Sequence, residues 1–332
     1  ASAELSDLRL LLPDYPIRSR EPVRLEVEGG RVRLSAFHLA GEGTDLEVTG
    51  GLDLLGDGPL GINARGRADL RALSVITRRL RGSGAARLSV DVTGTRSDPR
   101  LNGALALEGA GLRVRGFPHG VEDMEGTVRF TEQAAELDGV SGSFAGGRLT
   151  IDGEAAYAEG RLTSYDIRPS GRGLSLRSPE GLRSQIDAEL RLFGDAERQW
   201  ITGRVDVGQA LYTRRYDVAS ELLSMGRSLT PATPASLGEG AQIDLAIRAP
   251  GTLRIDNNLA SLTARADLAL QGTTQAPVVT GRAEIESGQL YFQGRTYVIR
   301  RGSLDFVNPR KLEPLFDIEA ETQIRSYRVT LH

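Results

Sequence analysis

The feature that most constrains this fold is a twenty-residue pattern that occurs three times along the chain. Its first copy is residues 88–107, LSVDVTGTRSDPRLNGALAL. In every copy a glycine is followed nine positions later by a second one, giving the pairs Gly94 and Gly103, Gly194 and Gly203, and Gly272 and Gly281. On both sides of the intervening turn, apolar residues recur at two-residue spacing, and most of the residues between them are charged or polar. Alternation of period two wets one face of a strand and buries the other, so the pattern predicts three β-hairpins.

The apolar positions of the three copies have the same offsets from their glycines. They are Leu88, Val90, Val92, Leu101, Leu105 and Leu107; Ala188, Leu190, Leu192, Ile201, Val205 and Val207; and Ala266, Leu268, Leu270, Val279, Ala283 and Ile285.

The composition favours one elongated, repetitive sheet over two or three compact domains. The 332 residues include 40 glycines, only 5% aromatic residues and a single tryptophan, Trp200. A globular core of this size normally collects more large aromatic side chains. Charged residues make up 26% of the chain with a net charge of -3. The basic residues are dispersed along strands without interleaved aromatics, so no nucleic-acid surface is predicted. Lys311 is the one lysine, and the arginines supply donors suited to phosphate head groups.

The chain has no cysteine, which excludes disulfides and thiolate metal sites. No apolar run approaches the roughly 20 residues of a membrane span. The sequence begins ASAEL, with neither an initiator methionine nor a signal peptide. We therefore expect a piece of a longer protein, whose membrane anchor lies outside this chain.

Two short helices are predicted among the strands. In residues 68–80, Leu70, Leu73, Ile76 and Leu80 are spaced for one helical face, which we expect to seal an edge or end of the sheet. A helix on a membrane surface is the alternative, given the arginines at 78, 79 and 81. Asp217 is a plausible cap for a second helix near residues 217–229. The predicted organisation is therefore a β segment over residues 1–229, a Pro/Ser/Gly-rich loop over 230–240 and a continuing β segment over 241–332.

Catalytic chemistry has little support in the sequence. Glu122 and Asp123 lie in a predicted loop over residues 117–124, and they form an acidic group with Glu125. Paired carboxylates cleave glycans in parallel β-helix enzymes, and that hypothesis requires Glu122 or Asp123 to be essential. A solvated loop explains the group more simply. No nucleophile motif or phosphate-binding loop is present, so we predict neither an enzyme nor a cofactor.

The three histidines are His38, His119 and His332, and no two of them have the spacing of metal ligands. We therefore predict no metal site.

The apolar strand faces remain as the candidate functional feature. They form either the core of a closed sheet or the lining of an open groove, and composition alone does not decide between these. An open trough of Leu, Val, Ile and Ala would suit acyl chains.

A resemblance to a known family lies in the C-terminal part. Residues 302–306 (GSLDF), Asn308–Pro309, Pro314 and residues 317–322 (DIEAET) resemble the conserved end region of the TamB family. Residues 41–54 and the G-T-x-x-x-P-x-x-x-G copies are similar to the same family. The middle copy departs from this pattern, with Asp195 in place of Thr and Gln199 in place of Pro.

The resemblance implies an all-β, curved, U-shaped sheet, a "β-taco", with an apolar inner groove. TamB proteins are the inner-membrane-anchored subunits of the translocation and assembly module, related to AsmA-like and bridge-like lipid transfer proteins. The resemblance therefore implies the periplasm of a diderm bacterium and a non-enzymatic lipid conduit that guides phospholipids between the two membranes. The alternative is a scaffold that assembles outer-membrane proteins by β-augmentation. The implied partners are phospholipid, an Omp85-type barrel subunit that binds beyond residue 332, and nascent outer-membrane proteins.

The predicted lining of the groove joins the hairpin positions to apolar residues of the C-terminal run. It comprises Leu88, Val90, Val92, Leu101, Leu105, Leu107, Leu190, Leu192, Ile201, Val205, Val207, Leu268, Leu270, Val279, Ala283, Ile285, Leu304, Phe306, Phe316 and Ile318.

Overall fold

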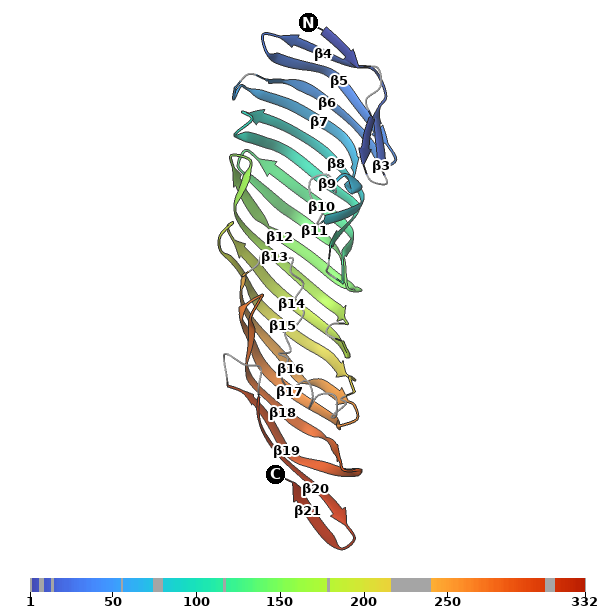
Figure 1. Cartoon of the computed structure of the whole chain (residues 1–332), viewed down its shortest axis with the longest axis vertical. Helices are drawn as coiled ribbons and strands as arrows, with labels where there is room; N and C mark the ends of the chain where they lie inside the picture. Colours follow the sequence, from blue (N-terminus) through green and yellow to red (C-terminus); the bar gives the residue numbers. More distant parts are fainter. Residues whose placement is uncertain are drawn as a thin grey trace. The chain divides into compact units, whose positions relative to one another are not determined.

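The protein is built almost entirely of β-strands (Figure 1). The computed structural model describes residues 2–5, 9–12, 15–54, 56–73, 80–115, 118–177, 180–215, 240–307 and 314–331. Within these ranges the only helix with assigned bounds is η1, a 3₁₀-helix at Leu70–Ala72. The predicted all-β, taco-like fold class is therefore confirmed.

The chain divides into two compact units. Unit 1 is Ala1–Phe144, Arg148–Pro169 and Leu192–Arg198, and unit 2 is Ala145–Gly147, Ser170–Arg191 and Gln199–His332. The first strands are β1 Ser2–Leu5, β2 Arg9–Leu12, β3 Tyr15–Ser19, β4 Val23–Glu28, β5 Arg31–Gly41, β6 Thr44–Asp53, β7 Leu60–Asp69, β8 Leu80–Gly94, β9 Pro99–Val114, β10 Val121–Thr131 and β11 Ala134–Phe144. The others are β12 Gly147–Ala158, β13 Arg161–Leu176, β14 Leu182–Gly194, β15 Gln199–Tyr212, β16 Gln242–Asp256, β17 Ala260–Thr273, β18 Pro277–Phe292, β19 Arg295–Phe306, β20 Leu315–Ile324 and β21 Tyr327–Leu331.

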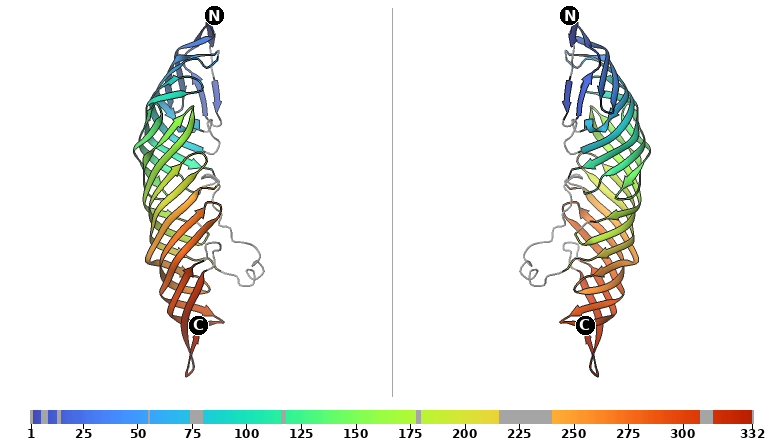
Figure 2. Two further views of the ribbon diagram at one scale, coloured as in Figure 1. Left: turned by 90° about the vertical axis from the view of Figure 1, so that its left-hand side faces the viewer. Right: turned by 90° about the vertical axis from the view of Figure 1, so that its right-hand side faces the viewer.

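In unit 1 the strands from β4 to β11 follow one another in sequence order as antiparallel neighbours, with β1 beside β4 and β3 beside β5. A tight hairpin turn joins β4 and β5 at Gly29–Gly30, since Glu28 lies opposite Arg31 and both glycines have positive φ. Among the described strands, none pairs β11 back to the first strands. The sheet of unit 1 is thus open, and its strands are bowed (Figure 2).

In unit 2 the strands from β16 to β21 are again sequential antiparallel neighbours. The exception is β15, which runs parallel to β16, with Trp200 opposite Gln242 and Tyr212 opposite Ile255. A parallel pair requires a crossover connection in place of a tight turn. Residues 216–239 between these strands, which contain the predicted helix near 217–229 and nearly all of the predicted 230–240 loop, lie outside the described residues.

The predicted helix over residues 68–80 is wrong at its start. Ala68 and Asp69 belong to β7, where Asp69 lies opposite Ala85 of β8. The Asp69 carboxylate then accepts a hydrogen bond from Arg71 N at 2.8 Å, which caps η1. Ladder pairing therefore overrides the helical spacing at these positions. Leu80 already belongs to β8, and residues 74–79 are outside the described ranges.

All three predicted turns share one construction. The first turn residue donates its backbone N–H to the carbonyl oxygen three residues later, and its side-chain oxygen accepts the N–H of that same residue. The backbone bonds are Thr95 to Asp98 at 3.1 Å, Asp195 to Arg198 at 2.9 Å and Thr273 to Ala276 at 3.3 Å. The side-chain bonds are 3.1, 2.7 and 3.1 Å, in the same order. The Asp195 carboxylate thus accepts the same hydrogen bond as the threonine hydroxyl of the other two copies. The turn of the middle copy therefore has the same structure despite its different sequence.

The second glycine of each copy lies within a strand where the neighbouring strand approaches closely. Gly103, Gly203 and Gly281 have φ angles of 137°, 142° and 117°. A Cβ atom at any of the three would lie 2.9 Å from the Cα atom of Val90, Leu190 or Leu268, respectively, and closer still to a carbonyl oxygen. Only glycine fits such a position.

No helix in the described ranges is long and apolar enough to span a membrane.

We predict that Gly203→Ala lowers the free energy of unfolding by about 2 kcal/mol or more, because the methyl group meets backbone atoms at a positive φ. Gly208→Ala, five residues along the same strand, is the matched control, since its nearest new contact is an ordinary 3.6 Å. It should change stability by less than about 0.5 kcal/mol. Urea unfolding of both variants checks this, and equal losses would contradict it.

A second prediction concerns Asp195. Hydrogen bonds from the backbone N–H groups of Arg198 and Glu197 lower the pKa of this carboxyl group. Its stabilisation is therefore present above the unfolded pKa of about 3.9 and is lost as the pH falls through the folded pKa. Asp195→Ala should lower the melting temperature at pH 7, with a difference from wild type that shrinks below about pH 4. Asp195→Thr should keep most of the stability at pH 7. Melting curves across this pH range test both outcomes.

Candidate functional site: the apolar face of the strands

The strand registers bring the predicted apolar positions of unit 2 together on one face, which we call the apolar face. Val205 lies opposite Ile247, and Ile247 lies opposite Leu268. Leu270 lies between Leu245 and Val279 in the neighbouring row. Adjacent strands are about 4.8 Å apart, so side chains in a row contact one another sideways.

A further row combines small and large residues. Ala266 lies opposite Ala283, Ala283 opposite Leu304, and Leu304 opposite Phe316. Together with Val207, Ala210 and Ala249, Ala266 and Ala283 form a cluster of buried side chains against which Leu268 and Leu304 pack.

Glycines lie opposite several of the larger side chains. Phe306 faces Gly281, and Ile318 faces Gly302. A Cβ atom at Gly302 would lie 2.6 Å from Cδ1 of Ile285, so the Ile285 side chain fills the space that Gly302 leaves. Ile201 continues the face on β15, opposite Ile243.

Unit 1 has the same arrangement on β7, β8, β9 and β10. Val92 lies between Ile62 and Leu101. Leu105 lies between Leu88 and Val128. The other predicted positions follow the same registers: Val90 faces Ala64 and Gly103, and Leu107 faces Ala86 and Gly126.

Most of the predicted lining is only half-buried. Of its twenty residues, Val90, Val207 and Ala283 are buried, whereas Phe316 has an exposed fraction of 74%. The others, Leu190 and Leu192 on β14 included, are of intermediate exposure. Val140 is the largest side chain that is fully buried in the described part of the chain. A second sheet packed on this face would cover these aliphatic side chains. The described residues of each unit therefore form a single layer with an uncovered apolar surface.

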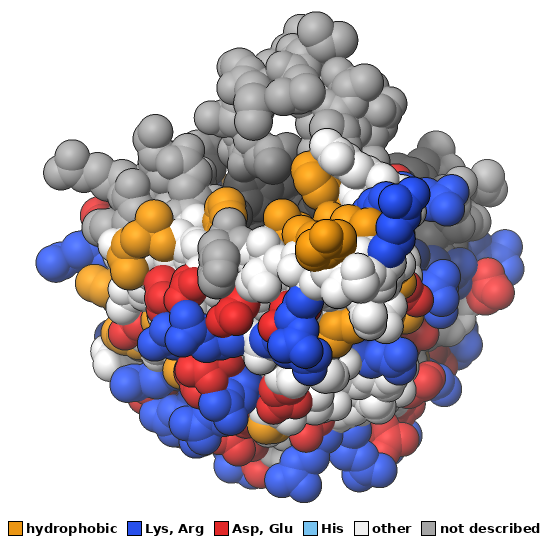
Figure 3. Space-filling model, turned by 90° about the horizontal axis from the view of Figure 1, so that it is seen from below, with side chains coloured by type: hydrophobic (Ala, Val, Ile, Leu, Met, Phe, Trp, Pro, Cys, Tyr) orange, Lys and Arg blue, Asp and Glu red, His pale blue; other side chains and the backbone are white. Residues whose placement is uncertain are grey.

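The opposite face of the strands carries charges of alternating sign. Arg248 pairs with Asp267 at 3.3 Å, and Arg282 pairs with Asp305 at 3.2 Å, while Asp267 lies opposite Arg282 in the ladder. Figure 3 shows charged side chains of both signs over much of the surface and hydrophobic ones gathered mainly toward one side. Exposed pairs of this kind contribute little stability each. They determine which face of the sheet meets water.

One such pair illustrates the electrostatics. Arg265 Nε lies 2.9 Å from Glu284 Oε2, and this hydrogen bond lowers the pKa of the Glu284 carboxyl group and raises that of Arg265. Both groups are exposed enough that the pair stays in solvent. It has no catalytic geometry.

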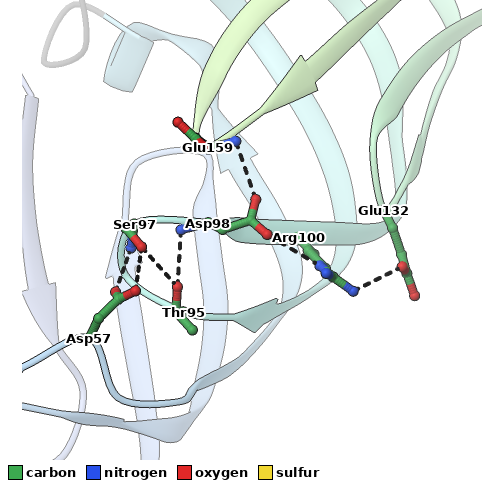
Figure 4. Close-up of polar contacts among 7 residues, drawn as sticks. All are labelled: Asp57, Thr95, Ser97, Asp98, Arg100, Glu132 and Glu159. Atoms are coloured by element: carbon green, nitrogen blue, oxygen red, sulfur yellow. Dashed lines mark hydrogen bonds and ion pairs between the residues drawn. The ribbon is translucent and has the colours of Figure 1, made fainter.

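A polar network joins successive turns at one edge of unit 1 (Figure 4). Asp57, between β6 and β7, accepts hydrogen bonds from the Ser97 N–H at 2.9 Å and from the Ser97 hydroxyl. These two bonds lower the pKa of Asp57. The Ser97 hydroxyl is also 3.1 Å from Oγ1 of Thr95 within its own turn. The bonds between Asp57 and Ser97 therefore join the β6–β7 turn to the β8–β9 turn.

The same network continues to the next two turns. Asp98 accepts a hydrogen bond from Glu159 N at 3.2 Å, and Arg100 lies 3.6 Å from Asp98 and 3.5 Å from Glu132. Glu132 belongs to the β10–β11 turn and Glu159 to the β12–β13 turn. Every polar group in this network has a structural partner, so it fixes the edge of the sheet.

The acidic group at residues 122–125 lies within a strand. The predicted loop over 117–124 is wrong beyond residue 120, because β10 begins at Val121. Glu122 pairs with Arg113 at 3.3 Å, and Asp123 has a φ of 51° at a bulge where the register with both neighbouring strands shifts. The bulge explains the cluster of exposed carboxylates without catalytic chemistry.

The described histidines are apart from one another. His38 lies opposite Glu47 on β6, and the His119 ring contacts the edge of Phe144 at 5.8 Å between centroids. His332 lies outside the described residues. No group of three or more His, Asp or Glu side chains in the described ranges is arranged to hold a metal ion.

Sequence analysis missed part of the apolar face. Leu245, Ile247 and Leu253 of β16 contribute to it, although β16 is not a copy of the repeat. Their alternation is visible in the sequence, but the parallel pairing that places Ile247 beside Val205 is not.

A comparison with protein families agrees with the C-terminal motifs. The family model of the TamB C-terminal domain matches residues 138–332, which is more than half of the chain. TamB proteins are non-enzymatic, inner-membrane-anchored components that span the periplasm and act with an Omp85-type partner. The chain therefore belongs to the TamB family, and with it to the translocation and assembly module of outer-membrane biogenesis.

Proposed function

We propose that the apolar face binds phospholipid acyl chains and guides them along the strands. The observation that carries this proposal is the uncovered state of the aliphatic rows: Leu268, Leu270 and Leu304 are flanked by apolar neighbours but remain half-exposed. A continuous apolar surface of this kind attracts an apolar ligand.

The relief of the apolar face suits the movement of acyl chains along it better than tight binding at one place. Alanine and glycine positions between the larger side chains leave a shallow surface without a deep pocket, as in the row Ala266, Ala283, Leu304. Each methylene that leaves water contributes about 0.8 kcal/mol, so a chain is held along its whole length by many similar contacts. No single residue should dominate, and head groups would remain in solvent at the edge of the sheet.

A second candidate function is a scaffold for outer-membrane proteins. It is favoured by β21, which pairs with β20 on one side and has no partner strand on its other side among the described residues. Such an edge can accept another strand by β-augmentation. This function depends on backbone groups and not on the apolar face.

The lipid hypothesis predicts contacts on alternate residues of one strand. Photo-crosslinking side chains at Leu268 and Leu270 should capture labelled phospholipid, because both lie on the apolar face. The same groups at Asp267 and Gln271, which are exposed on the opposite face, are the matched controls. Equal crosslinking at both sets, or none at Leu268 and Leu270 in a folded protein, would contradict the proposal.

Charge on the apolar face should separate the two functions. Leu270→Arg places a guanidinium among acyl contacts and should weaken phospholipid binding about tenfold. Gln271→Arg adds the same charge on the other face and should have little effect. Val279→Arg, directly opposite Leu270, repeats the test at a second position, with circular dichroism to show that each variant folds. Variants that lose phospholipid binding but still support outer-membrane assembly would favour the scaffold, because β-augmentation at β21 does not use the apolar face.

A further inference from the structure

Two neighbouring turns of unit 2 combine exposed aromatic rings with arginines. They are the β18–β19 turn, residues 291–296, and the β20–β21 turn, residues 323–328, and we call them the cationic tips. Tyr291, Phe292 and Tyr327 have exposed fractions of 37%, 52% and 73%. Arg295, Arg325 and Arg328 are exposed beside them.

The arginines of the tips are unpaired. Nearby Arg300 and Arg301 form ion pairs with Glu321 and Asp317. In contrast, no described carboxylate forms an ion pair with Arg295, Arg325 or Arg328. Neither residues 287–301 nor residues 322–331 contain an aspartate or glutamate, although the chain as a whole has a net charge of -3. The positive charge of the tips is therefore a local feature.

Several turns of unit 1 are different. The turns of unit 1 at the ends of β5, β8, β10 and β12 contain Glu42, Asp98, Glu132 and Glu159, respectively. The Asp98 carboxylate accepts a hydrogen bond from the backbone N–H of Glu159, and the Asp98 and Glu132 carboxylates both form ion pairs with Arg100. The cationic tips thus lack the carboxylates with which turns elsewhere bind one another.

The two tips lie at the same edge of the unit 2 sheet. Val298 lies opposite Glu321, so the start of β19 and the end of β20 point to one edge, and both turns project there in Figure 1. Beneath them, Tyr297, Ile299 and Ala320 are buried together, with Leu290 and Leu331 packed against them. This cluster joins β18, β19, β20 and β21 on the side of the sheet from which the two turns project.

We propose that the cationic tips dock on the surface of an anionic phospholipid membrane. Aromatic rings favour the head-group level of a bilayer, where an apolar body and a polar edge are both satisfied. Guanidinium groups without carboxylate partners can bind phosphates, which such a surface offers in every direction. Two projecting tips need no shape-matched partner, and the absence of carboxylates avoids repulsion from an anionic surface. This docking does not depend on what the apolar face carries.

Vesicle flotation of the whole 332-residue chain tests the proposal, using phosphatidylcholine vesicles with and without phosphatidylglycerol. The chain should float with the anionic vesicles and release at high salt. The triple variant Arg295→Gln, Arg325→Gln, Arg328→Gln should reduce partitioning at least about tenfold. The matched control is Arg96→Gln, Arg148→Gln, Arg161→Gln, which removes the same charge from exposed arginines near other turns and should reduce it less than about twofold.

Fluorescence gives a second measurement that does not depend on charge. In a Trp200→Phe background, the tryptophan emission of the Phe292→Trp and Tyr327→Trp variants should shift to shorter wavelength on anionic vesicles. The emission of Leu162→Trp, a control on β13 whose native side chain is about as exposed as Phe292, should not shift. Equal losses in both arginine variants would overturn the proposal, because binding would then follow net charge alone. A wild-type chain that does not float with anionic vesicles would also overturn it and would assign the tips to a protein partner. Neither result would affect acyl crosslinking on the apolar face, so the two proposals fail separately.

Discussion

The close approach of neighbouring strands at mid-strand glycines is the constraint on which this structure depends. At Gly103, Gly203 and Gly281 the adjacent backbone occupies the place of a side chain, and φ is positive. Such positions let strongly bowed strands keep their ladder hydrogen bonds while the sheet bends. Because glycine has no side chain, each of these positions also leaves the Val or Leu on the opposite strand without a side-chain neighbour on that side. The same residues therefore determine both the curvature of the strands and the shallow relief of the apolar face.

A single bowed layer explains the unusual burial. Most of the buried hydrophobic residues are alanines, as in the cluster of Ala249, Ala266 and Ala283, while leucines of the same rows remain half-exposed. Stability then depends on long backbone ladders and on contacts between side chains in adjacent strands, and not on a deep core. This arrangement leaves apolar surface available for a ligand, which a closed sandwich would have used for its own folding.

The sequence was sufficient to predict the hairpins and the face on which each apolar residue lies, because period-two alternation and turn chemistry are local properties. Thr95 and Thr273 build the turns as expected, and Asp195 shows that chemically different residues can build the same turn. Two features depend on distant pairing and could not be predicted. Asp69 joins β7 because Ala85 lies opposite it, despite helical spacing downstream. The parallel register of Trp200 with Gln242 has no signal in either strand, since alternation is the same in both directions. Many residues of the apolar face could thus be predicted, but the contribution of Leu245, Ile247 and Leu253 and the continuity of the face across β15 and β16 could not.

The distribution of carboxylates distinguishes the edges of the two units. In unit 1, Asp57 and Asp98 bind backbone N–H groups of neighbouring turns, which satisfies both partners and leaves little charge for an external ligand. In unit 2, Arg295 and Arg325 form no ion pair with a described carboxylate, and the strands that carry these turns are joined by the buried Tyr297 and Ile299. Where buried apolar side chains stabilise the strands beside a turn, the polar side chains of that turn remain free to bind another molecule. In one repetitive fold, the residues at the turns therefore decide the character of an edge. Carboxylates there bind neighbouring turns of the same sheet, whereas arginines without carboxylate partners can bind an external ligand.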